Sequence, residues 1–219
     1  DINNSKSIST IDLIQLRKLI LNIDQEFANN TSWRFVDANY QFADPSNPWA
    51  ASFPEIRNIN NLEGTELANF IAVKIGDVNE SARANNVQNL QPRSITDVVE
   101  LHTQEVNMRS GNVYTISFSA DISEVAGYQF TMELNPQQVD IVDLKPGIAK
   151  EENFGVFADQ GLITSSFHRD ADEEIEGTVL FSLTVRAKTN AALSEVLGIS
   201  SRYTTAEAYS FQDEDLALG

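Results

Sequence analysis

The sequence contains no cysteine and only two histidines, His102 and His168. Without cysteine the chain has no disulfide bond, no thiolate metal ligand and no cysteine nucleophile. The two histidines do not have the spacing of a metal-binding pair, and the chain lacks a Gly-x-Ser-x-Gly elbow, a phosphate-binding loop and a dinucleotide-binding glycine fingerprint. We therefore predict that the chain is not an enzyme.

Long apolar runs and positive charge are also scarce. No run of 18 apolar residues occurs, so no membrane-spanning helix is predicted. The formal net charge is −17, and it is uneven: residues 1–97 hold 12 acidic and 8 basic residues, whereas residues 98–219 hold 20 and 7. Such a surface repels nucleic acid and anionic membranes, so neither is expected as a partner. A hydrophobic content of 42% is enough to build a core.

The first twelve residues have the spacing of a calcium loop of EF-hand type, which uses side-chain oxygens at positions 1, 3, 5 and 12 and a carbonyl oxygen at position 7. The predicted ligands are Asp1, Asn3, Ser5, Ser7 (through its carbonyl) and Asp12. Ser9 is placed to hold a bridging water, and Ile8 is expected to anchor the loop in the core. Oxygen ligands of this kind suit Ca²⁺ better than zinc. Lys6 replaces the glycine usual at position 6, which weakens the expected affinity, and the competing interpretation is a polar turn without an ion.

A helix follows the loop in the correct phase. Ser9 or Thr10 is a suitable cap, and the helix is predicted to reach about Ile23. Its apolar residues recur every three or four positions and predict one broad buried stripe: Ile11, Leu13, Ile14, Leu16, Leu19, Ile20 and Ile23. A small core against this helix is predicted from Trp33, Phe35, Tyr40, Phe42, Trp49 and Phe53. Residues 70–75 are predicted to form a buried strand or a short extended segment.

The run Asp1–Leu21 resembles a type I dockerin half-repeat, and the resemblance extends over residues 1–24 and, in part, 70–81. A dockerin has two such loop–helix halves. The second would begin at Asp77, with Asn79 and Ser81 at the next ligand positions, but its position 12 is Gln88 and no amphipathic helix follows. Asp77 and Asn79 either bind a second ion with outside ligands or form an Asx turn.

The second half of the sequence has a different pattern. Residues 82–97 have no sustained periodicity and are predicted to link a domain of residues 1–81 to a domain of residues 98–219. In the latter, period-two alternation occurs over residues 114–120, 128–134 and 179–185, with turn signals between the runs. Many short strands at this spacing predict a mainly β fold, with an antiparallel sandwich or jelly roll preceded by the small loop–helix domain.

Residues 98–219 also resemble a cohesin-type module. The stretch Val125–Pro136 carries Gly-Tyr-Gln-Phe-Thr and then Asn-Pro, and Gly-Thr-Val-Leu-Phe-Ser-Leu follows at Gly177–Leu183. The resemblance implies a jelly-roll sandwich with a flat binding sheet. Cohesins bind dockerins, and related modules serve as spacers and adhesive units, so fold analogy leaves the role open.

Two further features have a functional and a structural interpretation. The charge run His168–Glu174 is either a solvated hairpin loop, which we favour, or a cation site or carboxylate pair. Trp33 and Trp49 either pack in the first domain, which we favour, or stack on sugar.

Together these patterns predict a calcium-stabilised, non-catalytic structural or adhesion segment of a large extracellular or bacterial cell-surface protein. Because the chain starts at the first ligand position of a motif, it is expected to be a fragment, and the missing signal peptide carries little weight. Its expected partners are proteins, either further modules of the same chain or other copies in a homo-oligomer. The alternatives are cohesin–dockerin recognition in an enzyme complex and a carbohydrate-binding accessory module.

Overall fold

The computed structural model describes residues 1–48, 50–78, 82, 98–211 and 215–218. The chain separates into two compact units, one of residues 1–19 and 24–89 and the other of residues 20–23 and 90–219. The predicted linker, apart from Ala82, lies outside the described residues, as does Trp49. Among the described residues, no helix is long and apolar enough to cross a membrane.

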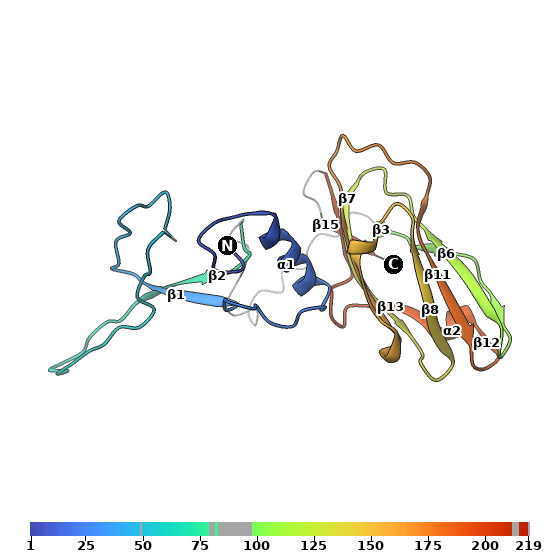
Figure 1. Cartoon of the computed structure of the whole chain (residues 1–219), viewed down its shortest axis with the longest axis horizontal. Helices are drawn as coiled ribbons and strands as arrows, with labels where there is room; N and C mark the ends of the chain where they lie inside the picture. The colour runs from blue at the N-terminus through green and yellow to red at the C-terminus, as the bar shows by residue number, and fades with distance from the viewer. Residues whose placement is uncertain (49, 79–81, 83–97, 212–214, 219) are drawn as a thin grey trace. The chain divides into compact units, whose positions relative to one another are not determined.

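The first unit contains helix α1 (Thr10–Ile20) up to Leu19 and a two-stranded antiparallel sheet of β1 (Trp33–Asp37) and β2 (Phe70–Lys74); Figure 1 shows these elements. Ser9 precedes the helix, and its backbone N–H donates to the Asp12 carboxylate at 2.8 Å, which is half of a capping box. The helix ends earlier than the predicted Ile23. The reason is Asn22, whose φ of 56° is a left-handed conformation that ends helices.

The prediction of one broad buried stripe on this helix is wrong. Ile11, Leu13 and Ile14 are 47%, 65% and 46% exposed, and Asp12 is the only buried residue of α1. The buried apolar residue of this region is Leu21, one position after the helix and only 1% exposed. Helical periodicity identifies an apolar face, but which part of the face is covered depends on packing partners elsewhere in the chain.

The aromatic core predicted for the first unit forms only in part. Tyr40, Phe42 and Phe53 make edge-to-face contacts, with ring centroids 5.1 and 5.7 Å apart. Phe35, however, is 47% exposed. Residues 70–74 form a strand as predicted, but this strand is not buried, because Ile71 is 58% exposed in a sheet of only two strands.

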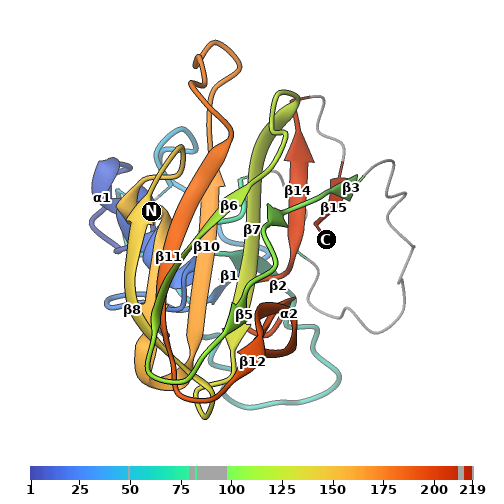
Figure 2. The same cartoon turned by 90° about the vertical axis from the view of Figure 1, so that its right-hand side faces the viewer.

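The second unit is an antiparallel sandwich, as predicted, and its strands are seen in Figure 2. One sheet has the strand order β3-β15-β14-β7-β10-β9, with β13 also paired to β7; the other has the order β4-β6-β11-β8. The strands of the first sheet are β3 (Val98–Val99), β7 (Val125–Leu134), β9 (Phe154–Phe157), β10 (Leu162–His168), β13 (Leu197–Ser200), β14 (Glu207–Ser210) and β15 (Asp215–Leu218). The second sheet contains β4 (His102–Thr103), β6 (Val113–Ser119), β8 (Val139–Pro146) and β11 (Val179–Ala187).

Short elements complete this unit. A two-stranded ladder joins β5 (Asn107–Met108) to β12 (Ala191–Ala192), and the remaining elements are the 3-10 helices η1 (Glu151–Asn153) and η2 (Ala158–Gln160) and the one-turn helix α2 (Leu193–Val196). The single parallel pairing in the described sheets joins β15 to β3.

The core lies between the two sheets and is built largely from aromatic rings. Phe181 of β11 is fully buried, with its ring centroid 4.8 Å from that of Phe118 and 5.1 Å from that of Phe154. The predicted alternation is confirmed in β6 and β7. In β11 it fails at the first residues, because a bulge between Val179 and Phe181 leaves Val179 40% exposed and buries Leu180.

Candidate metal centre and binding surface

The predicted calcium loop forms a tight turn in which its oxygen atoms converge. The Asp1 carboxylate accepts backbone N–H donors from Ser5 at 3.1 Å and from Lys6 at 2.7 Å. The side-chain oxygen of Asn3 accepts from the same Ser5 N–H at 3.0 Å. The Ser5 hydroxyl in turn donates to the Ser7 carbonyl oxygen at 3.3 Å. Oxygens of four predicted ligands therefore gather around one turn of the chain.

Asp12, the fifth predicted ligand, closes the loop. It is 3% exposed, and its Oδ1 accepts the Ile2 N–H at 2.6 Å, while its Oδ2 accepts from Ser9. Burial raises the pKa of the Asp12 carboxyl, but N–H donors from Ser9, Ile2 and Asn3 outweigh it, so the pKa lies below its ordinary value. Asp12 is thus ionised at neutral pH, and it joins the two ends of the loop even without an ion.

This pKa shift has a consequence for stability. A carboxyl whose pKa is lower in the folded chain stabilises the fold above its unfolded pKa of about 3.9, and that contribution disappears as the pH falls through the folded pKa. We expect the first unit of the calcium-free chain to lose stability below about pH 4, and Asp12→Asn to reduce this pH dependence. Thermal unfolding in chelator between pH 3 and 7, followed by tryptophan fluorescence, measures it, since both tryptophans lie in residues 1–89. Equal pH dependence in Asp12→Asn and the wild type would contradict the assignment.

The structure also shows the conformation of Lys6 and the residue that anchors the loop. Lys6 adopts a φ of 69°, so a lysine takes the left-handed conformation in which glycine is usual. Ile8, the predicted anchor, is 67% exposed, and this prediction is wrong. The anchor is Ile2, which is only 5% exposed. Its backbone N–H donates to Asp12, and its side chain lies next to Gly76, where an added Cβ would be 3.5 Å from the Ile2 Cδ1.

The second half-loop is described only at its start. Asp77 Oδ2 accepts the Ala82 N–H at 3.0 Å, five residues downstream, as Asp1 Oδ2 accepts the Lys6 N–H. Asp77 and Asp1 thus accept the same kind of backbone hydrogen bond from the residue five positions downstream. Asn79 and Ser81 lie outside the described residues, so a second site stays a prediction.

The donor set of the first loop fits a hard cation. It is composed entirely of oxygen, with two carboxylates and neutral amide, hydroxyl and carbonyl groups, which is the chemistry that Ca²⁺ prefers. Nowhere in the described part of the chain do three or more Asp, Glu or His side chains form a metal-binding group. A low-charge loop with two carboxylates is expected to bind calcium weakly.

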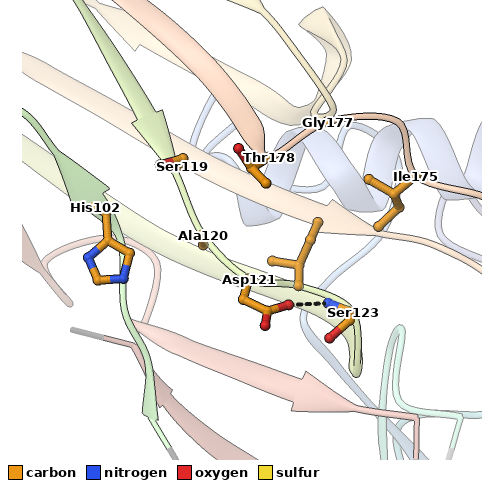
Figure 3. Close-up of a pocket in the computed structure, with 9 residues that line it drawn as sticks. His102, Ser119, Ala120, Asp121, Ser123, Ile175, Gly177 and Thr178 are labelled. Atoms are coloured by element: carbon orange, nitrogen blue, oxygen red, sulfur yellow. Dashed lines mark hydrogen bonds between the residues drawn. The ribbon is translucent and has the colours of Figure 1, made fainter.

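A shallow hollow of about 510 Å³ lies at one end of the sandwich (Figure 3). His102 and Ser119 come from neighbouring strands of one sheet, and Thr178 precedes β11. Asp121 accepts the Ser123 N–H at 3.0 Å, and the hydrogen bonds from Ser123 lower the pKa of the Asp121 carboxyl. A carboxylate held ionised in this way lacks the raised pKa that a general acid needs at neutral pH.

The charge run at residues 168–174 contains a buried arginine, Arg169, whereas the sequence predicts a solvated loop. Arg169 is 9% exposed, and its guanidinium donates to the carbonyl oxygens of Ile122, Ser123 and Val125 at 2.6–3.0 Å and to that of Glu173 at 3.2 Å. It also lies 4.6 Å from the ring centroid of Phe211. The guanidinium of Arg169 thus connects the turn at residues 122–125 to the loop at residues 169–173, which is a structural role.

The outer face of the first sheet holds the segment Ile20–Ile23, which belongs to the same unit as the sandwich. The Thr164 hydroxyl donates to the Leu21 carbonyl oxygen at 2.6 Å, and the Thr204 hydroxyl donates to that of Ile20 at 2.9 Å. A Cβ on Gly155 would lie 2.9 Å from the Leu21 carbonyl oxygen, so only glycine leaves room there. We call Gly155, Thr164 and Thr204 the Leu21 seat.

The seat is braced from within the sheet. Thr131 of β7 is fully buried, and its Oγ1 accepts the Thr204 N–H at 3.0 Å and the Tyr203 N–H at 3.2 Å. This contact fixes the turn that carries the Thr204 hydroxyl. No sequence pattern predicts the seat, since isolated threonines on a strand normally face solvent.

Comparisons with known proteins find similarity only among solved structures. No protein-family model matches the chain, and no curated protein matches it. One similar structure is a type I cohesin–dockerin complex from Clostridium thermocellum, with 13% identity over 57% of this chain and 90% of the other and a TM-score of 0.46. A cohesin from Clostridium acetobutylicum has 14% identity over 56% and 90% of the two chains, with a TM-score of 0.42.

A third is the second type II cohesin module of an adaptor scaffoldin of Acetivibrio cellulolyticus, with 12% identity over 54% and 81% of the two chains and a TM-score of 0.41. TM-scores below 0.5 at this identity do not establish kinship or function. The sandwich architecture rests on the strand order and register given above.

Proposed function

We propose that this chain is a calcium-stabilised, non-catalytic, protein-binding segment of an extracellular or cell-surface protein. The observation that carries the proposal is the convergence of oxygen atoms from Asp1, Asn3, Ser5 and Ser7 in a loop that the ionised Asp12 closes. A loop of this donor set is suited to the millimolar calcium outside cells, where weak sites with dissociation constants of about 10⁻⁴–10⁻³ M serve structural roles.

The described carboxyl groups with a clear pKa shift are not suited to act as general acids. Where the pKa of a described carboxyl clearly departs from its ordinary value, it is lowered, because hydrogen bonds to the ionised form outweigh burial; these groups are Asp12, Asp44, Glu55, Glu105 and Asp121. An acid that donates a proton at neutral pH needs the opposite shift. The protein-binding part of the proposal is supported by the Leu21 seat, which holds a peptide segment on a sheet face.

Calcium should stabilise the first unit. At 1 mM Ca²⁺ and a dissociation constant of about 0.1 mM, mass action adds roughly 1.4 kcal/mol, which corresponds to a rise of a few degrees in the melting temperature. Thermal unfolding followed by tryptophan fluorescence, in calcium and then in chelator, measures the shift. Asp1→Asn should remove most of it, because a neutral amide is a weaker calcium ligand than a carboxylate.

The matched control is Asp44→Asn. Asp44 forms a similar turn, in which its Oδ1 accepts the Ser46 N–H at 3.0 Å, but it lies outside the loop, so its calcium response should equal that of the wild type. A melting temperature that is the same in 10 mM calcium and in chelator would overturn the calcium assignment.

A further inference from the structure

We propose that calcium binding in the loop strengthens the contact of residues 20–23 with the Leu21 seat, because helix α1 connects the two. The inference rests on the proposed calcium binding and adds to it a regulated contact within the chain. The loop contains the residues that lead into the helix, and the seat holds the residues at its end. Calcium thereby determines how firmly this segment is held on the sheet.

Helix α1 has little support along its length. It has 11 residues, and isolated helices shorter than about 12–15 residues are only marginally stable in water. Ile11, Leu13 and Ile14 are exposed, and Asp12 is the only buried residue of the helix, so burial of an apolar face adds little. The stability of the helix therefore depends largely on what holds its two ends.

The loop fixes the start of the helix. The Asp12 carboxylate lies in the first turn and accepts the backbone N–H groups of Ile2 at 2.6 Å and Ser9 at 2.8 Å. Asp12 is also a predicted calcium ligand. Because the ion would bind the loop with Asp12 in its helical position, calcium favours the helix from the N-terminal end.

The seat fixes the end of the helix, where the last carbonyl groups have no partner within the helix. The Thr204 hydroxyl donates to the Ile20 carbonyl oxygen at 2.9 Å, and the Thr164 hydroxyl donates to that of Leu21 at 2.6 Å. The Leu21 side chain is buried in the same place. Because the segment belongs to the same chain, these few contacts need not offset the cost of bringing two molecules together.

The helix links its two ends energetically. Helix formation is cooperative, so a turn that is lost at one end weakens the turns beside it. Eleven residues form only about three turns, so both ends belong to one cooperative unit. A ligand that favours the helix then also favours the seated segment. By linkage, seating of the segment raises the calcium affinity by the same factor.

Two substitutions release the segment from opposite sides. Leu21→Ala removes the buried side chain, and alanine does not disfavour the helix. Gly155→Ala changes only the sandwich, because its Cβ would lie 2.9 Å from the Leu21 carbonyl oxygen and 2.6 Å from Thr164 Oγ1. The matched controls are Ile23→Ala, at a side chain that is 47% exposed, and Gly198→Ala, in β13 of the same sheet, where an added Cβ meets no atom within 4 Å.

Nitrogen-15-labelled full-length chain is titrated with calcium chloride, and the amide chemical shifts are recorded. In the wild type we expect the amides of Ser5, Thr164 and Thr204 to shift with one common dissociation constant. In Leu21→Ala and Gly155→Ala the threonine shifts should disappear, and the dissociation constant measured at Ser5 should rise about fivefold, the low end of typical coupling between two sites. Both controls should behave as the wild type does.

The inference is overturned if Ser5 titrates with the same dissociation constant in the wild type, Leu21→Ala and Gly155→Ala, or if calcium shifts Ser5 but neither threonine in the wild type. Calcium binding by the loop would survive both of these results. A wild-type Ser5 amide that does not respond to calcium would instead refute the calcium assignment and the inference with it. If Gly155→Ala loses its dispersed spectrum, Thr164→Val combined with Thr204→Val replaces it.

Discussion

Replacing Arg169 with methionine should lower the free energy of unfolding of the sandwich by about 3 kcal/mol. Methionine keeps most of the side-chain volume but cannot donate hydrogen bonds, so the carbonyl oxygens of Ser123 and Val125 lose the guanidinium donor. The Ile122 carbonyl oxygen loses it as well and keeps only the Val125 N–H at 3.1 Å. Each unmet buried acceptor costs roughly 1–3 kcal/mol, and partial access of water reduces the sum. Urea unfolding followed by far-ultraviolet circular dichroism measures the change, because the sandwich contains no tryptophan.

Two further variants isolate the cause. Arg169→Lys keeps the charge but lacks the planar fork that reaches several carbonyls at once, so we expect a loss of about 2 kcal/mol. Arg186→Met removes an exposed arginine from β11 and should change stability by less than about 0.5 kcal/mol. If Arg169→Met were no more destabilising than Arg186→Met, the guanidinium would not be what holds the turn and the loop together.

Phe181→Ala should cost more, about 3–5 kcal/mol, because it removes a fully buried ring from the middle of the core. The ring contacts aromatic side chains of both sheets, with centroid distances of 4.8 Å to Phe118 and 6.4 Å to Phe130. Truncation leaves a cavity that surrounding strands cannot close, since their backbones are fixed by ladder hydrogen bonds. The same urea measurement reports the loss.

A graded pair tests this explanation. Phe181→Leu should cost less than Phe181→Ala, because more of the volume stays filled. Val179→Ala, two residues away but 40% exposed, should cost under about 1 kcal/mol. Equal losses at positions 179 and 181 would mean that the bulge does not separate a solvent-facing from a core-facing residue.

The predictions from sequence succeeded where the signal is local. Alternation between Tyr128 and Leu134 follows directly from the pleat of a strand, and the sandwich places these residues as expected. The turn made by Asp1 and Asn3 also depends on residues only a few positions apart. Whether the loop holds calcium is a matter of affinity, which geometry alone does not determine, and it stays a prediction.

The predictions failed where the cause is distant in the sequence. Arg169 lies in a charged run that looks solvated, and its burial depends on carbonyl groups at residues 122–125, more than forty positions earlier. Leu21 is buried because Thr164 and Thr204 lie on strands and turns that the helical pattern cannot specify. A local pattern shows which side chains of a segment can be buried, and tertiary contacts determine which of them are buried.

The parallel pairing of β3 with β15 has a mechanical consequence. The first and last described strands of the sandwich lie side by side, with Val98 opposite Ala217 and Val99 opposite Leu218, and they run in the same direction. A force that pulls the start of β3 away from the end of β15 therefore acts along both strands in opposite senses. It loads the hydrogen bonds between them together, in shear, whereas antiparallel end strands would open one bond at a time. Tension applied at these two strands is therefore carried in shear by the pairing of β3 with β15.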